Sequence, residues 1–205
     1  MNKPEEISVI NEKCESELKE KNSRFIGFAF PIENEEGVQF HLKELKKKYY
    51  DATHHCYAYK TLKLAKYSDS GEPSGTAGIR IFNAIEHFNL TNTLVVVVRY
   101  FGGTKLGVGG LGKAYYETAI KALEKAKKIN KKLYQKVLIS VDFEQVNKIY
   151  QIFNETENRI LNTTYSDNVE FECLIASDNI RQTISKLKDA TNGSININPV
   201  EMIYF

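Results

Sequence analysis

Two polar segments hold most of the residues whose types and spacing could do chemistry. The first runs from Arg99 to Lys113 and holds six of the chain's twelve glycines within residues 102–112. Glycine costs chain entropy on folding, so this density indicates a backbone that needs unusual torsions or a close approach to another group. The segment lies between an apolar run and a helical pattern, where free N–H groups and the helix dipole favour an anion.

The second segment is the compact turn from Asp69 to Thr76, DSGEPSGT. Its Pro and Gly residues fix the backbone, and its Ser, Thr, Asp and Glu residues add short-range hydrogen-bonding groups. Because both segments lead into predicted helices, we expect them to form one binding surface. The candidate binding residues are His54, Asp69, Glu72, Ser74, Thr76, Arg99, Tyr100, Gly102, Gly103, Lys105, Gly109, Gly110 and Lys113.

The stretch Gly107–Ala114, GVGGLGKA, is spelled like two nucleotide-binding motifs. A G-x-G-x-x-G fingerprint should follow its strand directly and precede an acidic residue about 20 positions on. Here the loop starts several residues after the strand, and Lys131–Lys132 stand at that later position. A P-loop needs Ser or Thr after its lysine to bind Mg²⁺, but Ala114 follows Lys113. Both interpretations are therefore disfavoured.

A third candidate is a metal or nucleophilic site built from His54, His55 and Cys56. On a strand, His54 and Cys56 would share one face and His55 the other. Two ligands without a third at a recognisable spacing are weak grounds for a metal site, so a partly buried strand is favoured. We therefore assign no catalytic residue, no metal ligand and no cofactor.

The composition is that of a soluble globular protein, with 205 residues, 42% hydrophobic and 26% charged residues. A net charge of +2 does not identify a nucleic-acid-binding protein. Lysines do gather in one region, where a solvated helix face is favoured over a phosphate-binding patch. These lysines are Lys43, Lys46, Lys47, Lys48, Lys60, Lys63 and Lys66.

The chain contains no apolar run that would span a membrane and no apolar signal-peptide core. Its three cysteines lie far apart without a C-x-x-C motif, which indicates reduced thiols. We therefore expect a cytoplasmic protein without a membrane partner.

The pattern predicts an α+β protein with domains at 1–131 and 132–205. In the first domain we expect strands at 15–20, 24–31, 53–61 and 93–100, and helices at 34–49, from an N-cap at Ser74 or Thr76 through Phe88, and at 111–128. In the second we expect strands at 133–142, 159–165, 168–176 and 194–203, and helices at 143–154 and 178–190, the latter with Asp178 as N-cap. The order βαββαβ is that of a ferredoxin-like domain.

Four strings together resemble the signature of the YigZ/IMPACT family, and the resemblance covers most of residues 10–130. They are SRFIGFAFPI, HHCYAY, SDSGEPSGTAG and VVVVRYFGGTKLGVGGLGKAY. The remaining third of the chain resembles the small C-terminal domain of bacterial members. Ser70 departs from the family pattern, which commonly reads Asp-Asp-Gly-Glu-Pro here. The missing carboxylate weakens any metal or acid/base role for the turn.

The resemblance implies an N-terminal domain with the second-domain fold of small-subunit ribosomal protein five, shared with domain IV of elongation factor G. It also implies a C-terminal domain like domain V of elongation factor G. Eukaryotic members regulate translation by competing for the scaffold protein that activates the amino-acid-starvation kinase. Bacterial members, which the two-domain build matches, have no settled biochemical role.

Our leading hypothesis is a non-enzymatic, translation-associated regulator that binds RNA, the ribosome or a ribosome-linked protein through the glycine-loop surface. Arg99, Lys105 and Lys113 are its candidate phosphate contacts. The aromatic residues that could stack on unpaired bases are Tyr57, Tyr59, Tyr100 and Phe101. The alternative is an enzyme or small-molecule-binding protein that acts on a phosphorylated or anionic ligand at the same loop.

Overall fold

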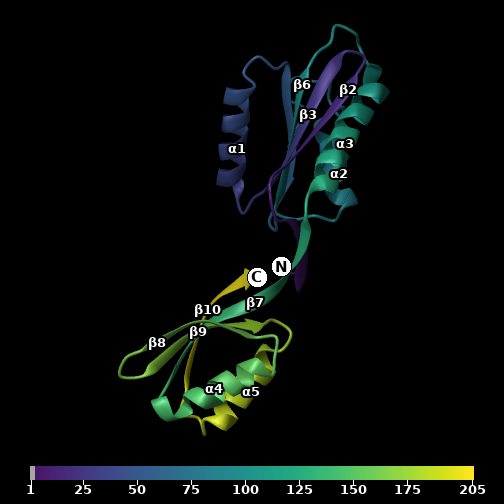
Figure 1. The fold of residues 1–205 in the computed structure, drawn as a ribbon. Coiled ribbons are helices and arrows are strands. Elements are labelled where there is room, and N and C mark those ends of the chain that lie inside the picture. The colour runs from purple at the N-terminus through teal and green to yellow at the C-terminus, as the bar shows by residue number, and fades with distance from the viewer. Residues whose placement is uncertain (1–2) are drawn as a thin grey trace. The chain divides into compact units, whose positions relative to one another are not determined.

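A computed structural model of the chain describes residues 3–205 as two compact α+β units (Figure 1). This confirms the α+β class and the two-domain build. One unit is Ser8–Asn130, and the other combines Lys131–Phe205 with the N-terminal segment through Ile7. The sequence assigned that segment to the first domain. The structure instead assigns the segment to the second unit. The reason is that strand β1 (Glu6–Ile10), which the sequence did not predict, is a neighbour of β7 (Lys128–Val141) in the second sheet.

The unit Ser8–Asn130 contains an antiparallel five-stranded sheet with helices on both faces (Figure 1). In spatial order its strands are β2 (Cys14–Glu20), β3 (Ser23–Pro31), β6 (Thr93–Tyr100), β4 (His54–Lys60) and β5 (Ala65–Ser68). Helix α1 (Glu35–Lys48) covers one face, and α2 (Gly78–His87) and α3 (Gly107–Lys125) cover the other.

Strand β6 is the centre of this sheet and is buried on both faces, as its apolar run predicts. Val95 and Val97 pack in the core under α2 and α3. Val96 and Val98 pack in the separate core under α1. Strand side chains alternate between faces, so Arg99 faces the same side as Val95 and Val97, and Tyr100 faces the same side as Val96 and Val98.

Helix α3 begins at Gly107, four residues earlier than the sequence predicts, and ends at Lys125. Gly109 and Gly110, predicted to lie in a loop, are in its first turn. Glycine is a poor helix former, but packing of an apolar face stabilises a helix more than intrinsic propensity does. That face includes the buried residues Leu111 and Tyr115.

Two predicted helix caps are wrong. Helix α2 has Ala77 at its N-cap position, without a side-chain cap bond there, instead of Ser74 or Thr76. Helix α5 (Ile180–Ala190) begins after Asn179 instead of Asp178.

The second unit has an antiparallel sheet in which β10 (Asn196–Tyr204) pairs with β7, β7 with β9 (Val169–Ala176), and β9 with β8 (Arg159–Tyr165). Helices α4 (Val146–Asn154) and α5 pack on one apolar core with these strands. From β7 onward the order of these elements is the predicted βαββαβ. None of the helices between residues 3 and 205 is long and apolar enough to cross a membrane.

Gly102 allows two backbone segments of the first unit to touch. A Cβ atom at Gly102 would lie 2.0 Å from the carbonyl carbon of Asn22, whereas one at Gly109 would meet nothing within 4 Å. We expect Gly102→Ala to lower the free energy of unfolding by about 3 kcal/mol through overpacking. Gly109→Ala, the matched control, should raise it by about 0.5–1 kcal/mol because alanine favours the helix.

Urea denaturation of both variants measures these changes. Equal stabilities of the two variants would contradict the close approach at Gly102.

Candidate functional site

The site begins with a row of three side chains across the sheet of the first unit. His54 of β4 is the register partner of Arg99 on β6, and Arg99 is in turn the partner of Phe25 on β3. All three lie at the end of the sheet where the Asp69–Thr76 turn also lies, because His54 contacts Ser70 of that turn. Strand register therefore positions these groups, and the turn supplies Glu72.

Glu72 and Arg99 form a buried ion pair. Arg99 Nη1 donates to Glu72 Oε1 over 2.6 Å, and the two side chains are only 6% and 3% exposed. The Arg99 guanidinium also lies over the rings of Phe25 and Phe101, at 5.2 and 5.4 Å from their centroids. Removing one member of such a pair leaves an uncompensated buried charge, so both residues are needed together.

Tyr115 and Cys56 complete a hydrogen-bonded network around this pair. Tyr115 Oη donates to Glu72 Oε1 over 2.7 Å. The Cys56 thiol donates to Asp69 O over 2.9 Å and lies 3.3 Å from Tyr115 Oη. Burial raises the pKa of Cys56 to about 12 and also raises the pKa of Tyr115. Since the thiolate is the nucleophilic form, Cys56 is a structural thiol.

The Asp69 side chain stabilises the turn and also binds the backbone N–H groups at the start of α2, eight and nine residues later in the sequence. Its carboxylate accepts from the backbone N–H groups of Gly75, Ala77 and Gly78 over 2.9, 2.9 and 2.8 Å. Burial alone would raise the pKa of Asp69, but these three bonds outweigh it and hold that pKa below 3.8. Thr76, expected as a cap, instead donates its hydroxyl to Pro73 O over 2.6 Å.

His54 links the strand to the turn. Its Nδ1 lies 3.0 Å from Ser70 O, and because a carbonyl only accepts, Nδ1 carries the proton. Its Nε2 lies 3.8 Å from Glu72 Oε2. The structure thus brings His54, Asp69, Glu72 and Arg99 together.

The remaining predicted residues lie outside this network. Tyr100 points to the α1 face and donates its hydroxyl to Asp51 Oδ1 over 2.8 Å. Lys113 lies 3.6 Å from Glu117 on the same exposed helix face. The solvent-exposed candidates are Ser74, Gly103, Lys105, Gly109 and Gly110.

Sequence reasoning missed Ser23 and Tyr115. The Ser23 hydroxyl accepts from Gly102 N over 3.1 Å and from Arg99 Nη2 over 3.4 Å. Tyr115 lies four residues after Leu111, on the buried stripe of α3. A tyrosine on such a stripe needs a partner for its hydroxyl, and this is the signal that could have identified it.

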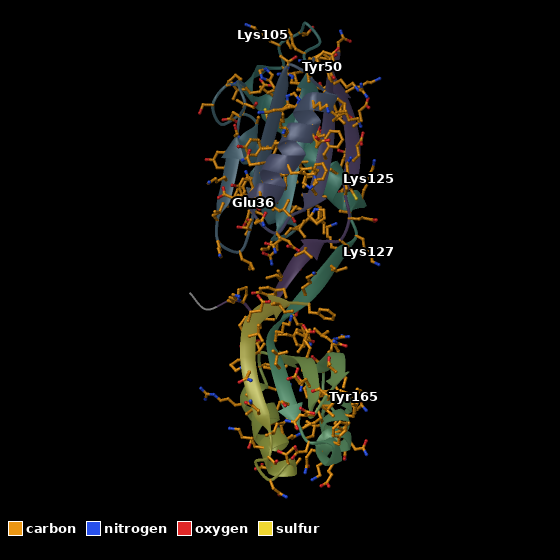
Figure 2. All side chains as sticks on the ribbon, turned by 90° about the vertical axis from the view of Figure 1, so that its left-hand side faces the viewer. Glu36, Tyr50, Lys105, Lys125, Lys127 and Tyr165 are labelled. Atoms are coloured by element: carbon orange, nitrogen blue, oxygen red, sulfur yellow. The ribbon has the colours of Figure 1, made fainter. Side chains whose placement is uncertain are left out.

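The network is part of a surface that we call the loop end, made of residues 46–53, 69–77 and 99–107, most of which are exposed. Two hydrogen bonds join the first and last of these segments: Thr53 N donates to Arg99 O over 2.9 Å, and Phe101 N donates to the Thr53 side-chain Oγ1 over 3.0 Å. Figure 2 shows Tyr50 and Lys105 together at this end of the unit. Tyr50 is 83% exposed and Phe101 46% exposed.

The loop end carries a modest excess of positive charge, with five Lys or Arg side chains against the carboxylates of Asp51, Asp69 and Glu72. Arg99 neutralises Glu72, whereas Asp69 accepts only from backbone N–H groups and keeps its charge. Lys105 and the lysines in the last turn of α1 are exposed and have no ion pair among residues 3–205. These α1 lysines are Lys46, Lys47 and Lys48.

Comparison with known proteins places the chain in a family. Residues 21–123 match the Impact N-terminal domain, and residues 139–194 match a domain of unknown function, DUF1949. The chain is 33% identical to the IMPACT family member YvyE of Bacillus subtilis, over 95% of this chain and 91% of that protein. It belongs to the IMPACT family.

Other IMPACT relatives differ in how much of their length matches. The IMPACT family member YigZ of Escherichia coli is 27% identical over 88% of this chain and 91% of its own. Protein IMPACT of Oryctolagus cuniculus is 36% identical over 44% of this chain and 30% of its own. A crystal structure described as an hypothetical protein has a TM-score of 0.69 and 25% identity, covering 97% of this chain and 98% of its own.

The buried pair generates a stability prediction. Glu72→Gln should lower the free energy of unfolding by about 3–5 kcal/mol, because Arg99 would stay charged and buried without a counter-ion. Glu117→Gln, which removes an exposed carboxylate, should cost less than about 0.5 kcal/mol. The double variant Glu72→Gln/Arg99→Met should be more stable than Glu72→Gln alone.

Urea denaturation of these variants gives the comparison. If the double variant were less stable than Glu72→Gln, the penalty would not come from an uncompensated arginine.

Asp69 generates a pH prediction. Its folded-state pKa is lowered, so the unfolded chain takes up the proton first, and the stability it contributes is lost as pH falls below 3.8. Asp69→Asn should therefore be less stable than wild type at neutral pH, and the difference in free energy of unfolding should narrow as pH falls below the ordinary pKa of an aspartate. Urea denaturation across this range measures it, with the exposed Asp167→Asn as control. Parallel curves for wild type and Asp69→Asn would contradict the role of the carboxylate.

Proposed function

We propose that this chain is a non-enzymatic, translation-associated regulator whose loop end binds single-stranded RNA. The observation that carries the proposal is that exposed aromatic rings and lysines without ion pairs occur together at the loop end. The rings are those of Tyr50 and Phe101, and the lysines include Lys47 and Lys105. A ribosome-linked protein partner is the competing outcome of the test described below.

Charge supports an RNA ligand. Lys47 and Lys105 are exposed at the loop end, where five Lys and Arg side chains outnumber three carboxylates and Arg99 neutralises Glu72. Lysines that neutralise phosphates release counterions, which supplies much of the affinity of a nucleic-acid-binding protein. Arg99, expected as a phosphate contact, is buried against Glu72 and acts by holding the surface in shape.

Aromatic exposure supports a single-stranded ligand. Tyr50 and Phe101 present exposed rings at the loop end. Exposed aromatic rings beside a cationic surface stack on successive bases with little sequence preference. The other expected aromatics, Tyr57, Tyr59 and Tyr100, pack in the core under α1.

The chemistry of the network supports a non-catalytic role. Oε1 of Glu72 is paired with both Arg99 and Tyr115. The raised pKa of about 12 keeps Cys56 protonated at neutral pH. A general base needs a free acceptor near its reacting group, and the Nε2 atom of His54, whose side chain is 19% exposed, already faces Glu72 Oε2 at 3.8 Å.

Family membership supports the link to translation. The sequence resemblance implies folds like the second domain of ribosomal protein five and domain V of elongation factor G, both of which are proteins of translation. Eukaryotic IMPACT members regulate translation through a protein partner. We extend the ribosome-linked role, and a cytoplasmic location, to this chain as part of the proposal.

The start of α3 favours a second candidate, an anionic small-molecule ligand. This helix has no side-chain cap bond at Leu106, and no atom lies within 4 Å of where a Cβ would stand at Gly107 or Gly109 in its first turn. Free N–H groups at a helix N-terminus attract anions. Displacement of bound RNA by a nucleotide would indicate that this ligand uses the same surface.

The test is fluorescence anisotropy with a labelled single-stranded RNA across a salt series. Replacing Lys47 and Lys105 with alanine should weaken binding and reduce the slope of log K against log salt by about 1.4, since each contact to a single strand contributes about 0.7. Tyr50→Ala should weaken binding by about 1–3 kcal/mol at every salt concentration without changing that slope.

The matched control is Lys125→Ala/Lys127→Ala, which removes the same charge at the other end of the unit (Figure 2). Equal losses in the two double variants would indicate non-specific attraction. Absent binding, together with nuclease-resistant capture of a ribosomal protein, would replace RNA with a protein partner.

A further inference from the structure

Helix α1 carries an exposed row of residues on the side opposite its buried face. We call this row the α1 stripe; it consists of Phe40, Lys43 and Lys47, and it continues to Tyr50 beyond the helix end. Spacings of three and four residues place these positions on one side of a helix. Figure 2 faces α1, with Glu36 near the start of the helix and Tyr50 beyond its end. The buried residues of α1 are Val38, Leu42 and Leu45.

The α1 stripe exposes two aromatic rings that the core does not use. Phe40 is 61% exposed, and Tyr50, two residues after the last residue of the helix, is 83% exposed. The Phe40 ring meets the His41 ring edge-on, with 5.3 Å between the centroids. A single exposed apolar residue is common on protein surfaces, but two rings in one row with lysines between them form a defined surface.

The lysines of α1 are not used inside the protein. Residues 39–50 hold four lysines and one carboxylate, that of Glu44. These lysines have no ion pair among residues 3–205. The negative end of the helix dipole accounts for the lysines at 46–48 in the last turn, but not for Lys43, which lies before that turn. The surface therefore favours an anionic ligand along the helix and not only at its end.

The positive charge stops at the first turn of α1. Glu36 is exposed one turn before Phe40, and its carboxylate repels phosphate groups. A phosphate-containing ligand is thereby confined to the row from Phe40 to Tyr50. At a rise of about 1.5 Å per residue this row is about 15 Å long. A strand with a stacked spacing of about 3.4 Å per nucleotide covers it with about four or five nucleotides.

The order of residue types favours a nucleic acid over a partner helix or a lipid surface. A partner helix needs a continuous apolar row, and Lys43 and Lys47 interrupt this one. A lipid surface needs a wide apolar helix face, and that face of α1 is buried on the sheet. Rings that stack on bases, with lysines between them that contact phosphates, match a single strand.

We infer that single-stranded RNA bound at the loop end continues along the α1 stripe as far as Phe40. Tyr50 belongs to both surfaces and joins them. Bases stack on the rings of Tyr50 and Phe40, and Lys43 and Lys47 contact the phosphates between these bases. The inference rests on the proposed function and adds to it the path and the length of the bound strand.

Fluorescence anisotropy at low salt with two labelled oligouridines, of about four and about 12 nucleotides, tests this path. Phe40→Ala/Lys43→Ala should bind the longer probe about tenfold more weakly than wild type, equivalent to about 1.4 kcal/mol, because one stacking ring and one phosphate contact are lost. The shorter probe, which the loop end alone can hold, should bind both proteins with equal affinity. Glu36→Gln should strengthen binding of the longer probe only.

The matched control is Lys121→Ala/Phe143→Ala, which removes exposed residues of the same types from α3 and from the second unit. It should bind both probes as wild type does. If Phe40→Ala/Lys43→Ala weakened neither probe, or both equally, the path along α1 would be wrong while RNA binding at the loop end would stand.

If wild type bound neither probe, the proposed function and the path would both be wrong. Loss of binding to phosphatidylserine-containing vesicles in Phe40→Ala/Lys43→Ala, with RNA binding unchanged, would also overturn the path and assign the α1 stripe to a lipid surface. A thermal melt of each variant confirms that the fold is retained.

Discussion

The buried ion pair between Glu72 and Arg99 is the interaction on which the loop end depends. Glu72 comes from the turn before α2 and Arg99 from the last buried position of β6, so the pair fixes a turn to the centre of the sheet. Tyr115 adds the third turn of α3 to the same carboxylate oxygen. Three segments that are distant in sequence therefore share one buried charge. Each would lose its anchor if that charge were removed.

This arrangement explains why a rigid polar surface needs so many special residues. Asp69 satisfies three amides and lets the turn present Glu72 to the core. Gly102 lets the chain leave β6 against the backbone of Asn22. A buried charge tolerates little movement, because its hydrogen bonds must all be kept. The exposed lysines and aromatic rings above the network thus lie on a rigid support.

Much of the fold could be predicted because it follows from periodic apolar patterns. The run Leu94–Val98 predicted the central strand, and the βαββαβ order predicted the second unit. Strand β1 was missed because its short sequence is recognisable only through its pairing with β7. The early start of α3 was missed because three of its first four residues are glycines, whose intrinsic propensity opposes a helix.

The site was only partly predictable for a different physical reason. The sequence marked His54, Asp69, Glu72 and Arg99 as polar residues in special segments, but partners depend on strand register. Arg99 is in phase with Val95 and Val97, which indicates a buried position, while Tyr100 is in phase with the α1 face. A buried arginine requires an acid, and no local pattern shows that Glu72, 27 residues away, supplies it.

The central claim is that the buried pair supports an RNA-binding surface at the loop end. Two-dimensional ¹H–¹⁵N NMR of the labelled protein, titrated with a short single-stranded RNA, tests it most directly. The account predicts that shift changes concentrate in residues 46–53 and 99–107. Changes confined to the second unit or to residues 33–36, or an unchanged spectrum at saturating RNA, would contradict it.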